Sequence, residues 1–169
     1  AVAAVGDILG IPAKVYRKVF VEFKGVEHRM ELTRSIDGVE FYNDSKATTP
    51  EAASWALQRF DEPVYLICGG RDKKVDFTLM RDLVRRKVKT AIVIGEAREK
   101  IRKAFDGYVP VVQCGDLKSA IETAWHQAGR GDRVILSPMC TSFDMFKDYE
   151  HRGRVFKELV NALKSKAAV

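Results

Sequence analysis

Apolar positions along the chain alternate between two spacings, one typical of short buried strands and one typical of amphipathic helices. Strand-like segments are expected at residues 30–35, 39–43, 64–68, 91–94, 109–113 and 134–137. Helix-like segments are expected at residues 51–59, 77–87, 98–105, 117–128 and 152–164. This alternation predicts an α/β fold, a Rossmann-like and mostly parallel sheet with helices on both faces. Asp37-Gly38 predicts a hairpin turn between the first two strands.

The first 24 residues do not follow this alternation. Two short helices are expected at Ala1–Leu9 and Ala13–Phe23, separated by Gly10-Ile11-Pro12. Glycine commonly ends a helix and proline commonly begins one. Two such helices cannot bury their apolar faces by themselves. We therefore interpret residues 1–24 as the tail of an upstream domain and residues 25–169 as the main domain, with Lys24-Gly25 as the joint.

Composition narrows the class of protein. The chain is 46% hydrophobic and 31% charged, as in a globular domain, and no apolar run approaches the roughly 20 residues that span a bilayer. The three cysteines are widely spaced, which argues against disulfides and a zinc site and favours the reducing cytoplasm. The net charge of +6 favours anionic partners.

Ligands of parallel sheets collect where the carboxyl ends of the strands open into loops. Three such loops carry many functional groups: residues 43–50, 69–76 and 137–147. The loops after Ile94 and Gln113 do not. In the first loop, Lys46 and the amides of the next helix could bind an anion, or Thr48 and Thr49 could simply cap that helix. On spacing alone, both interpretations stay open.

The second loop joins Gly69-Gly70 to a basic stretch. Paired glycines could let the backbone approach a ligand, and basic side chains suit a carboxylate, although the spacing by itself slightly favours an exposed charged turn. In the third loop, small polar residues and two aromatic ones predict a lined pocket. Cys140 would need a nearby histidine to act as a nucleophile, and His151 is the nearest in sequence.

Four separated motifs, in the same order and spacing, resemble the Mur ligases, and within that family its D-glutamate-adding members. They are G-V-E-H-R at 25–29, N-D-S-K-A-T at 43–48, G-G-R-D-K at 69–73 and S-P-x-C-x-S-F-D-x-F-K at 137–147. The resemblance covers residues 1–164. It implies the C-terminal domain of a cytoplasmic ligase that joins D-glutamate to UDP-N-acetylmuramoyl-L-alanine, with ATP and Mg²⁺, through an acyl phosphate.

The resemblance also implies roles for single residues. Thr48, Lys73 and Ser142 match ligands of the D-glutamate carboxylates, and Phe143 and Tyr149 match positions that line the same pocket. Arg29, Asp44 and Lys46 match positions that face ATP, and Lys46 is the residue expected to assist catalysis. Thr49 replaces the usual asparagine, and Met139 and Thr141 stand where smaller residues are common, which affects the fine geometry of the pocket.

The P-loop, the magnesium ligands and the UDP-binding domain of the family all precede the residues of this chain, so no metal ligand is expected here and the chain alone is expected to be inactive. A sister Mur ligase or a folylpolyglutamate synthetase relative is the near alternative. A stand-alone binding module for nucleotides or other anions is a second class. Nucleic-acid binding lacks support, because aromatic residues are not interleaved with basic ones, and no G-x-G-x-x-G motif supports an oxidoreductase.

Overall fold

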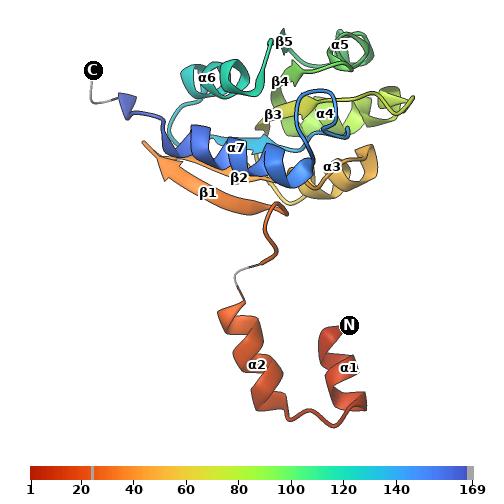
Figure 1. Cartoon of the computed structure of the whole chain (residues 1–169), viewed down its shortest axis with the longest axis vertical. Helices are drawn as coiled ribbons and strands as arrows, with labels where there is room; N and C mark the ends of the chain where they lie inside the picture. The colour runs from red at the N-terminus through yellow and green to blue at the C-terminus, as the bar shows by residue number, and fades with distance from the viewer. Residues whose placement is uncertain (24, 167–169) are drawn as a thin grey trace.

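A single six-stranded sheet organises the domain, in a computed structural model that describes residues 1–23 and 25–166 (Figure 1). The strand order is β1-β2-β6-β3-β4-β5. β1 runs antiparallel to β2, and every other neighbouring pair is parallel. The strands are β1 (Glu31–Ile36), β2 (Val39–Asn43), β3 (Val64–Gly69), β4 (Val88–Ile94), β5 (Val111–Gln113) and β6 (Arg133–Leu136). The predicted α/β fold is confirmed.

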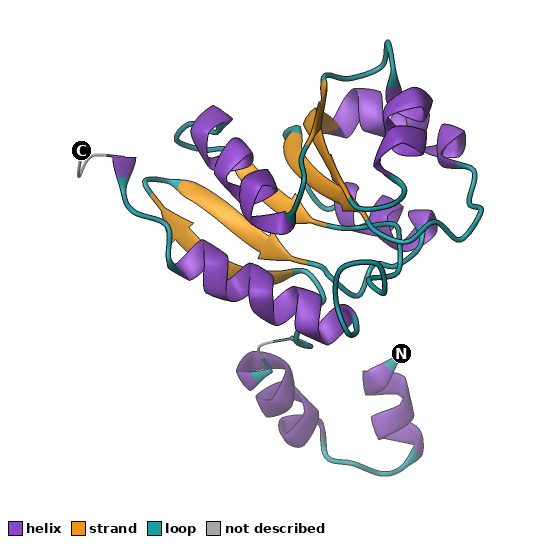
Figure 2. Cartoon of the chain, turned by 45° about the horizontal axis from the view of Figure 1, so that its top comes forward, coloured by secondary structure: helices purple, strands orange, loops and turns teal. Residues whose placement is uncertain are grey.

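Helices cover both faces of the sheet, and each face has its own apolar core (Figure 2). One face carries α3 (Pro50–Leu57), the 3-10 helix η1 (Phe77–Met80), α4 (Arg81–Lys87) and α5 (Arg98–Phe105). The other carries α6 (Leu117–Gln127) and α7 (Tyr149–Asn161). The central strand β3 is buried along its whole length because both of its faces are covered.

Most predicted segments are present, with corrections at their ends. The helix expected at 77–87 is divided, because the Asp76 carboxylate accepts the Thr78 amide at 2.9 Å and tightens the first turn into η1. α7 begins at Tyr149, three residues earlier than predicted, because Asp148 caps it by accepting the His151 amide at 2.6 Å. The predicted hairpin is confirmed, with φ of 51° at Asp37 and 79° at Gly38.

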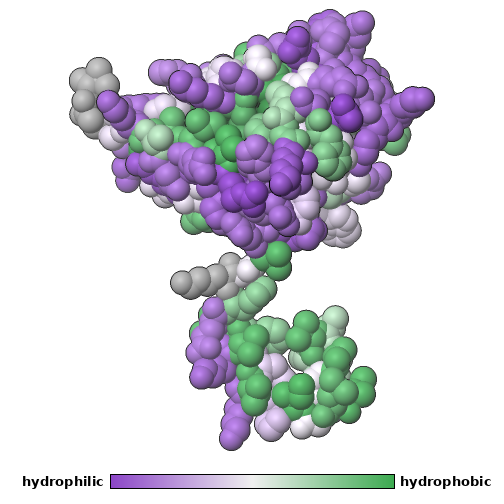
Figure 3. Space-filling model, viewed as in Figure 1, coloured by the Kyte–Doolittle hydropathy of each residue, from purple (hydrophilic) through white to green (hydrophobic). Residues whose placement is uncertain are grey.

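The two N-terminal helices, α1 (Val2–Ile8) and α2 (Ala13–Glu22), lie apart from the sheet (Figure 1). α2 buries none of its residues. Figure 3 shows hydrophobic surface concentrated on these helices, and their exposed apolar side chains include Val5, Ile8, Val15, Val19 and Phe20. The predicted joint includes Lys24, which lies outside the described residues. None of the described helices is long and apolar enough to cross a membrane.

Candidate functional site

The three loops singled out from the sequence follow three neighbouring strands, β2, β6 and β3. These strands are parallel, so all three loops emerge at the same edge of the sheet. We call residues 43–49, 69–73 and 137–147 the site loops. The sheet order places the loop after β6 between the other two, although it comes last in the chain.

Main-chain hydrogen bonds join the site loops to one another. The Met139 amide donates to the Ala47 carbonyl at 2.9 Å, and the Arg71 amide donates to the Thr141 carbonyl at 3.0 Å. The Gly69 amide donates to the Pro138 carbonyl at 2.8 Å. The loop after β6 is therefore bonded on both sides, and the three loops form one surface.

Arg152 of α7 lies beneath that surface and is only 1% exposed. Its guanidinium donates to Ser45 Oγ at 3.0 Å, to the Ser45 carbonyl at 2.9 Å and to the Cys140 carbonyl at 3.2 Å. Burial lowers the pKa of Arg152 to about 10, which leaves it charged at neutral pH. One buried cation thus connects the first and third site loops and adds positive potential under the edge.

The glycine pair of the second loop, Gly69 and Gly70, packs tightly against neighbouring backbone. A Cβ at Gly69 would lie 2.1 Å from the Ile94 carbonyl oxygen, and one at Gly70 would lie 2.3 Å from the Thr141 carbonyl oxygen. The φ angles are 112° and 135°. Neighbouring backbone fills the space where a side chain would lie, so only glycine fits here, and the close approach of a ligand to this backbone stays a prediction.

Asp44 is a buried carboxylate that ties three strands together. It accepts the Met30 amide at 3.2 Å, just before β1, and the Ser137 hydroxyl at 2.9 Å, just after β6. Burial raises the pKa of Asp44 to about 6, although both hydrogen bonds and the charge of Arg29 act in the opposite direction. Arg29 is exposed, so its cation is available to a ligand beside Asp44.

Lys46 and Tyr149 face each other across the first loop and the start of α7. The Lys46 ammonium lies 5.5 Å from the centre of the Tyr149 ring, and the Ser45 hydroxyl donates to the Tyr149 carbonyl at 2.7 Å. Tyr149 also meets the His28 ring edge-on at 6.1 Å. These contacts hold the aromatic side chain beside the loop that carries the lysine.

The remaining predicted residues belong to the same edge. Thr48 is half-buried, and the cap of α3 is Thr49, whose hydroxyl accepts the Ala52 amide at 3.3 Å, so capping does not occupy Thr48. Lys73 is exposed, and hydrogen bonds from the Glu51 amide and the Thr49 hydroxyl lower the pKa of Glu51 at the start of α3, with a smaller contribution from the charge of Lys73. Ser142 is buried, whereas Phe143 is 59% exposed. All eight predicted residues therefore lie on, or directly beside, the site loops.

The sequence of this domain is similar to those of known proteins. The sequence profile described as "Mur ligase, glutamate ligase domain" matches residues 28–140. The chain belongs to the Mur ligase family. A UDP-N-acetylmuramoylalanine–D-glutamate ligase of Chlorobium limicola is 48% identical over 96% of this chain and 35% of its own length. The corresponding Aquifex aeolicus protein is 46% identical over 90% of this chain and 37% of its own length. The chain thus spans about a third of the length of these relatives.

Solved structures support the same fold at low sequence identity. A UDP-N-acetylmuramate-alanine ligase from Thermotoga maritima matches with a TM-score of 0.69 and 14% identity, over 95% of this chain and 36% of that one. Folylpolyglutamate synthase of Mycobacterium tuberculosis, solved with ADP and AMPPCP, matches with a TM-score of 0.67 and 14% identity, over 98% of this chain and 39% of that one. The architecture is therefore common to Mur ligases and folylpolyglutamate synthases.

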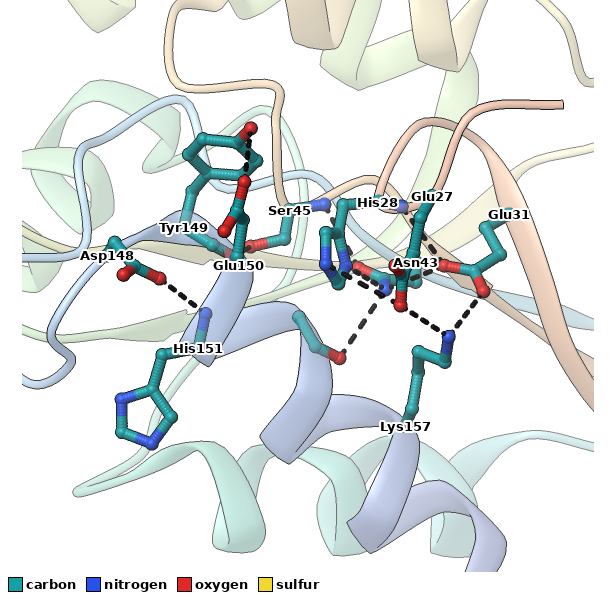
Figure 4. A network of polar contacts seen from close by, with 11 residues as sticks. Glu27, His28, Glu31, Asn43, Ser45, Asp148, Tyr149, Glu150, His151 and Lys157 are labelled. Carbon is teal, nitrogen blue, oxygen red and sulfur yellow. Dashed lines mark hydrogen bonds and ion pairs between the residues drawn. The ribbon is translucent and has the colours of Figure 1, made fainter.

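Sequence reasoning missed two residues of this Mur ligase domain. Arg152 was placed only as the start of the last helix. His28 was not selected, yet it is buried with a φ of 62°, and its Nδ1 lies 2.9 Å from the Asn43 amide nitrogen. Figure 4 shows this contact within a network that reaches Glu31 and α7. The only available signal was that His28 lies inside the G-V-E-H-R motif.

Among the described residues, one group could offer ligands to a metal ion: Glu27, His28 and Glu31. The Lys157 ammonium already binds both carboxylates, at 2.9 Å from Glu27 and 2.6 Å from Glu31 (Figure 4). Both carboxylates of the group are therefore already paired with a cation of α7.

Cys140 does not have the properties of a nucleophile. It is 1% exposed, and burial raises the pKa of its thiol to about 12. His151, its nearest histidine in sequence, instead accepts the Lys147 amide at 3.2 Å and packs its ring against Phe146. The alternative of a cysteine nucleophile is wrong, and the carbonyl of Cys140, not its sulfur, contributes to the site.

Proposed function

We propose that residues 25–169 form the amino-acid-binding domain of an ATP-dependent ligase that adds D-glutamate to UDP-N-acetylmuramoyl-L-alanine in peptidoglycan precursor synthesis. The observation that carries the proposal is the gathering of two lysines, two hydroxyls and a buried arginine at one edge of the sheet. Relatives whose names state this reaction are 48% and 46% identical to the chain, which supports the choice within the family.

D-glutamate would bind through its two carboxylates. A dicarboxylate that leaves water needs cations and hydrogen-bond donors in place of its hydration shell. Lys73 supplies the cation and Thr48 and Ser142 supply hydroxyl donors, one from each site loop. Phe143 and Tyr149 line the same pocket, where their rings exclude water from the amino acid.

ATP would contact the opposite end of the first site loop. Arg29 and Lys46 suit its phosphates and Asp44 suits its ribose hydroxyls. In the reaction the carboxylate of the acceptor takes the γ-phosphoryl group, ADP leaves, and the D-glutamate amine then displaces phosphate to form the amide. Lys46 would stabilise the negative charge that develops on the transferred group, which is the usual task of lysine in phosphoryl transfer.

The rest of the ligase would hold the remaining components. We assign residues 1–24 to the end of a central ATPase domain, which explains why α1 and α2 expose their apolar faces. Because Lys157 occupies the one candidate metal group of the described residues, we place the Mg²⁺ ligands and the UDP-linked acceptor in that preceding part. The isolated chain would then be inactive, and the ligase would act in the cytoplasm.

Two alternatives remain distinguishable by experiment. A sister Mur ligase or folylpolyglutamate synthetase would share the fold, as the structural matches do, but its domain would favour another amino acid or a folate. A stand-alone module for nucleotides or other anions would bind phosphates without distinguishing the isomers of glutamate.

The test is an NMR titration of the chain with D-glutamate and, separately, L-glutamate. We expect weak but isomer-selective binding that is lost in Lys73→Ala, since the pocket would lose its exposed cation. Lys118→Ala is the matched control, because Lys118 is also an exposed lysine and lies on α6, on the other face of the sheet from α3. Equal response to both isomers, or equal affinity in Lys73→Ala and Lys118→Ala, would refute the proposed role of this site.

A further inference from the structure

Trp55 is the most conspicuous side chain that the proposed site leaves unexplained. It lies on α3, whose other face packs into the core through Ala53, Ala56 and Leu57, yet the tryptophan itself is 74% exposed. Tryptophan is a large apolar side chain that is highly buried on average, so strong exposure indicates a surface that meets another molecule.

A cavity of about 480 Å³ opens beside Trp55 and extends to the start of β1. One wall is apolar, formed by Ala52, Trp55 and Ala56 of α3 together with Met30. The charged groups Arg29, Arg59 and Asp44 line another part, and Phe23, Gly25 and Val26 before β1 complete the lining. The volume falls in the range of small-molecule pockets, and the mixture of a flat aromatic wall with charged groups is typical of them.

The chemistry of this cavity suits a nucleotide. An indole face stacks favourably with the face of a nucleobase. Two arginines suit a di- or triphosphate, since guanidinium groups form paired hydrogen bonds with phosphate oxygens. The Asp44 carboxylate accepts hydrogen bonds, which ribose hydroxyls donate. The cavity therefore offers one group for each part of a nucleotide: base, sugar and phosphate.

We infer that Trp55 is the platform on which the adenine base of the nucleotide stacks. The inference rests on the proposed function, since Arg29 and Asp44 are the residues proposed to contact ATP. It adds a base-recognising residue from α3, outside all four sequence motifs.

The two tryptophans of the chain make this inference measurable. Trp125 is only 5% exposed, packs against Phe41 in the core on the opposite face of the sheet, and has Lys166 4.3 Å above its ring. Fluorescence that responds to a ligand in the cavity can therefore come from Trp55 alone, and Trp55→Phe leaves Trp125 as a silent reference while keeping an aromatic ring.

The experiment titrates the chain with ADP and, in parallel, with pyrophosphate, which has the phosphates without the base. Indole fluorescence is excited at the red edge of its band, where adenine does not absorb. We expect saturable quenching by ADP, none by pyrophosphate, and none in Trp55→Phe. By NMR, Trp55→Phe should keep most of the ADP affinity, whereas Trp55→Ala should weaken it about tenfold.

Leu79→Ala is the matched control for the loss of exposed apolar surface. Leu79 is 81% exposed and lines a separate cavity on the other side of Trp55, so its removal should leave ADP binding unchanged. ADP binding that shifts Arg29 and Lys46 amides without quenching Trp55 would overturn the inference and leave the proposed function standing, as would the absence of any response to ADP. In that case Trp55 would serve contact with the preceding part of the ligase. The D-glutamate titration decides the proposed function separately.

Discussion

The loops at the carboxyl edge of the sheet fall into two groups that are built differently. The site loops after β2, β6 and β3 are bonded to one another and held by the buried guanidinium of Arg152. The loop after β4 is joined to them, because the Ala97 amide donates to the Gly70 carbonyl at 2.8 Å and the Glu96 amide donates to the Asp144 carboxylate at 2.9 Å. The loop after β5 instead relies on a local device, the Asp116 carboxylate, which accepts the Ser119 amide at 2.7 Å and caps α6. Asp44, an aspartate of the first group, does not cap a helix. Its carboxylate accepts hydrogen bonds from Met30, before β1, and from Ser137, after β6.

This difference shows which loops have their relative positions fixed by the fold. Local capping positions one helix and can be changed without consequence elsewhere. The cross-loop bonds of the first group fix the relative positions of side chains that are far apart in sequence, which a site for a charged ligand requires, because donors must be in place before the ligand loses its water. Three substitutions separate the two groups.

The largest effect is expected from Arg152→Gln. The change removes the buried cation and leaves the carbonyls of Ser45 and Cys140 without their donors, at a cost of about 3–5 kcal/mol in the free energy of unfolding. Urea unfolding measures this cost, and the D-glutamate response should vanish even where the domain remains folded. Arg102→Gln, on the exposed face of α5, is the control and should leave both quantities unchanged. Equal stability of the two variants would refute the role of Arg152.

A smaller effect is expected from a glycine-to-alanine substitution in the first group of loops, compared with the same substitution in the loop after β5. Gly70→Ala would place a Cβ 2.3 Å from the Thr141 carbonyl oxygen at a φ of 135°, so we expect a loss of about 2 kcal/mol or more. Gly115→Ala, in the loop after β5, meets no atom within 4 Å and should be near neutral. Thermal unfolding of both variants compares the two groups directly, and similar melting temperatures would contradict it.

The smallest effect is a gain of stability in Asp44→Asn. The folded pKa of Asp44, about 6, is above its ordinary value of 3.8, so the folded state holds the proton more tightly than the unfolded chain. Its stabilising contribution is complete below pH 3.8 and is lost as pH rises through 6, at most about 3 kcal/mol. The asparagine variant should therefore be about 1–2 kcal/mol more stable at pH 8 and lack this pH dependence.

Urea unfolding at pH 5 and pH 8 checks that prediction, with Asp106→Asn, an exposed position, as the control. A wild-type domain whose stability rises between these two conditions relative to Asp44→Asn would contradict it. A charged carboxylate kept in a buried position against its own stability is typical of groups retained for function.

The helices and strands could be predicted because their signals are local. The Asp37-Gly38 turn and the apolar spacing of residues 117–128 each specify an element without reference to the rest of the chain. The ends were less accurate, as at α7, where the capping carboxylate of Asp148 was overlooked. The insertion of β6 between β2 and β3 is set by packing across the sheet, and no short segment encodes it.

The candidate site could be predicted from its sequence motifs. The residues that were missed, Arg152 and His28, act through contacts with residues that are distant in the sequence. Polar residues in loops after predicted strands can be recognised from the sequence, as for Lys73, Thr48 and Ser142. Arg152 has no such signal, since an arginine on an amphipathic helix normally faces water. The glycines were noticed for the right property, freedom of φ, but their neighbours are the Ile94 and Thr141 carbonyls, which the sequence could not reveal.

The central claim is that the three site loops form a single preformed pocket for D-glutamate. It is tested most directly by following the amide resonances of Lys46, Lys73 and Ser142, one from each loop, while D-glutamate is added. The account predicts that all three shift along one binding curve with a common Kd and that L-glutamate reproduces none of these shifts. Shifts confined to one loop, separate curves for the three residues, or an equal response to L-glutamate would contradict it.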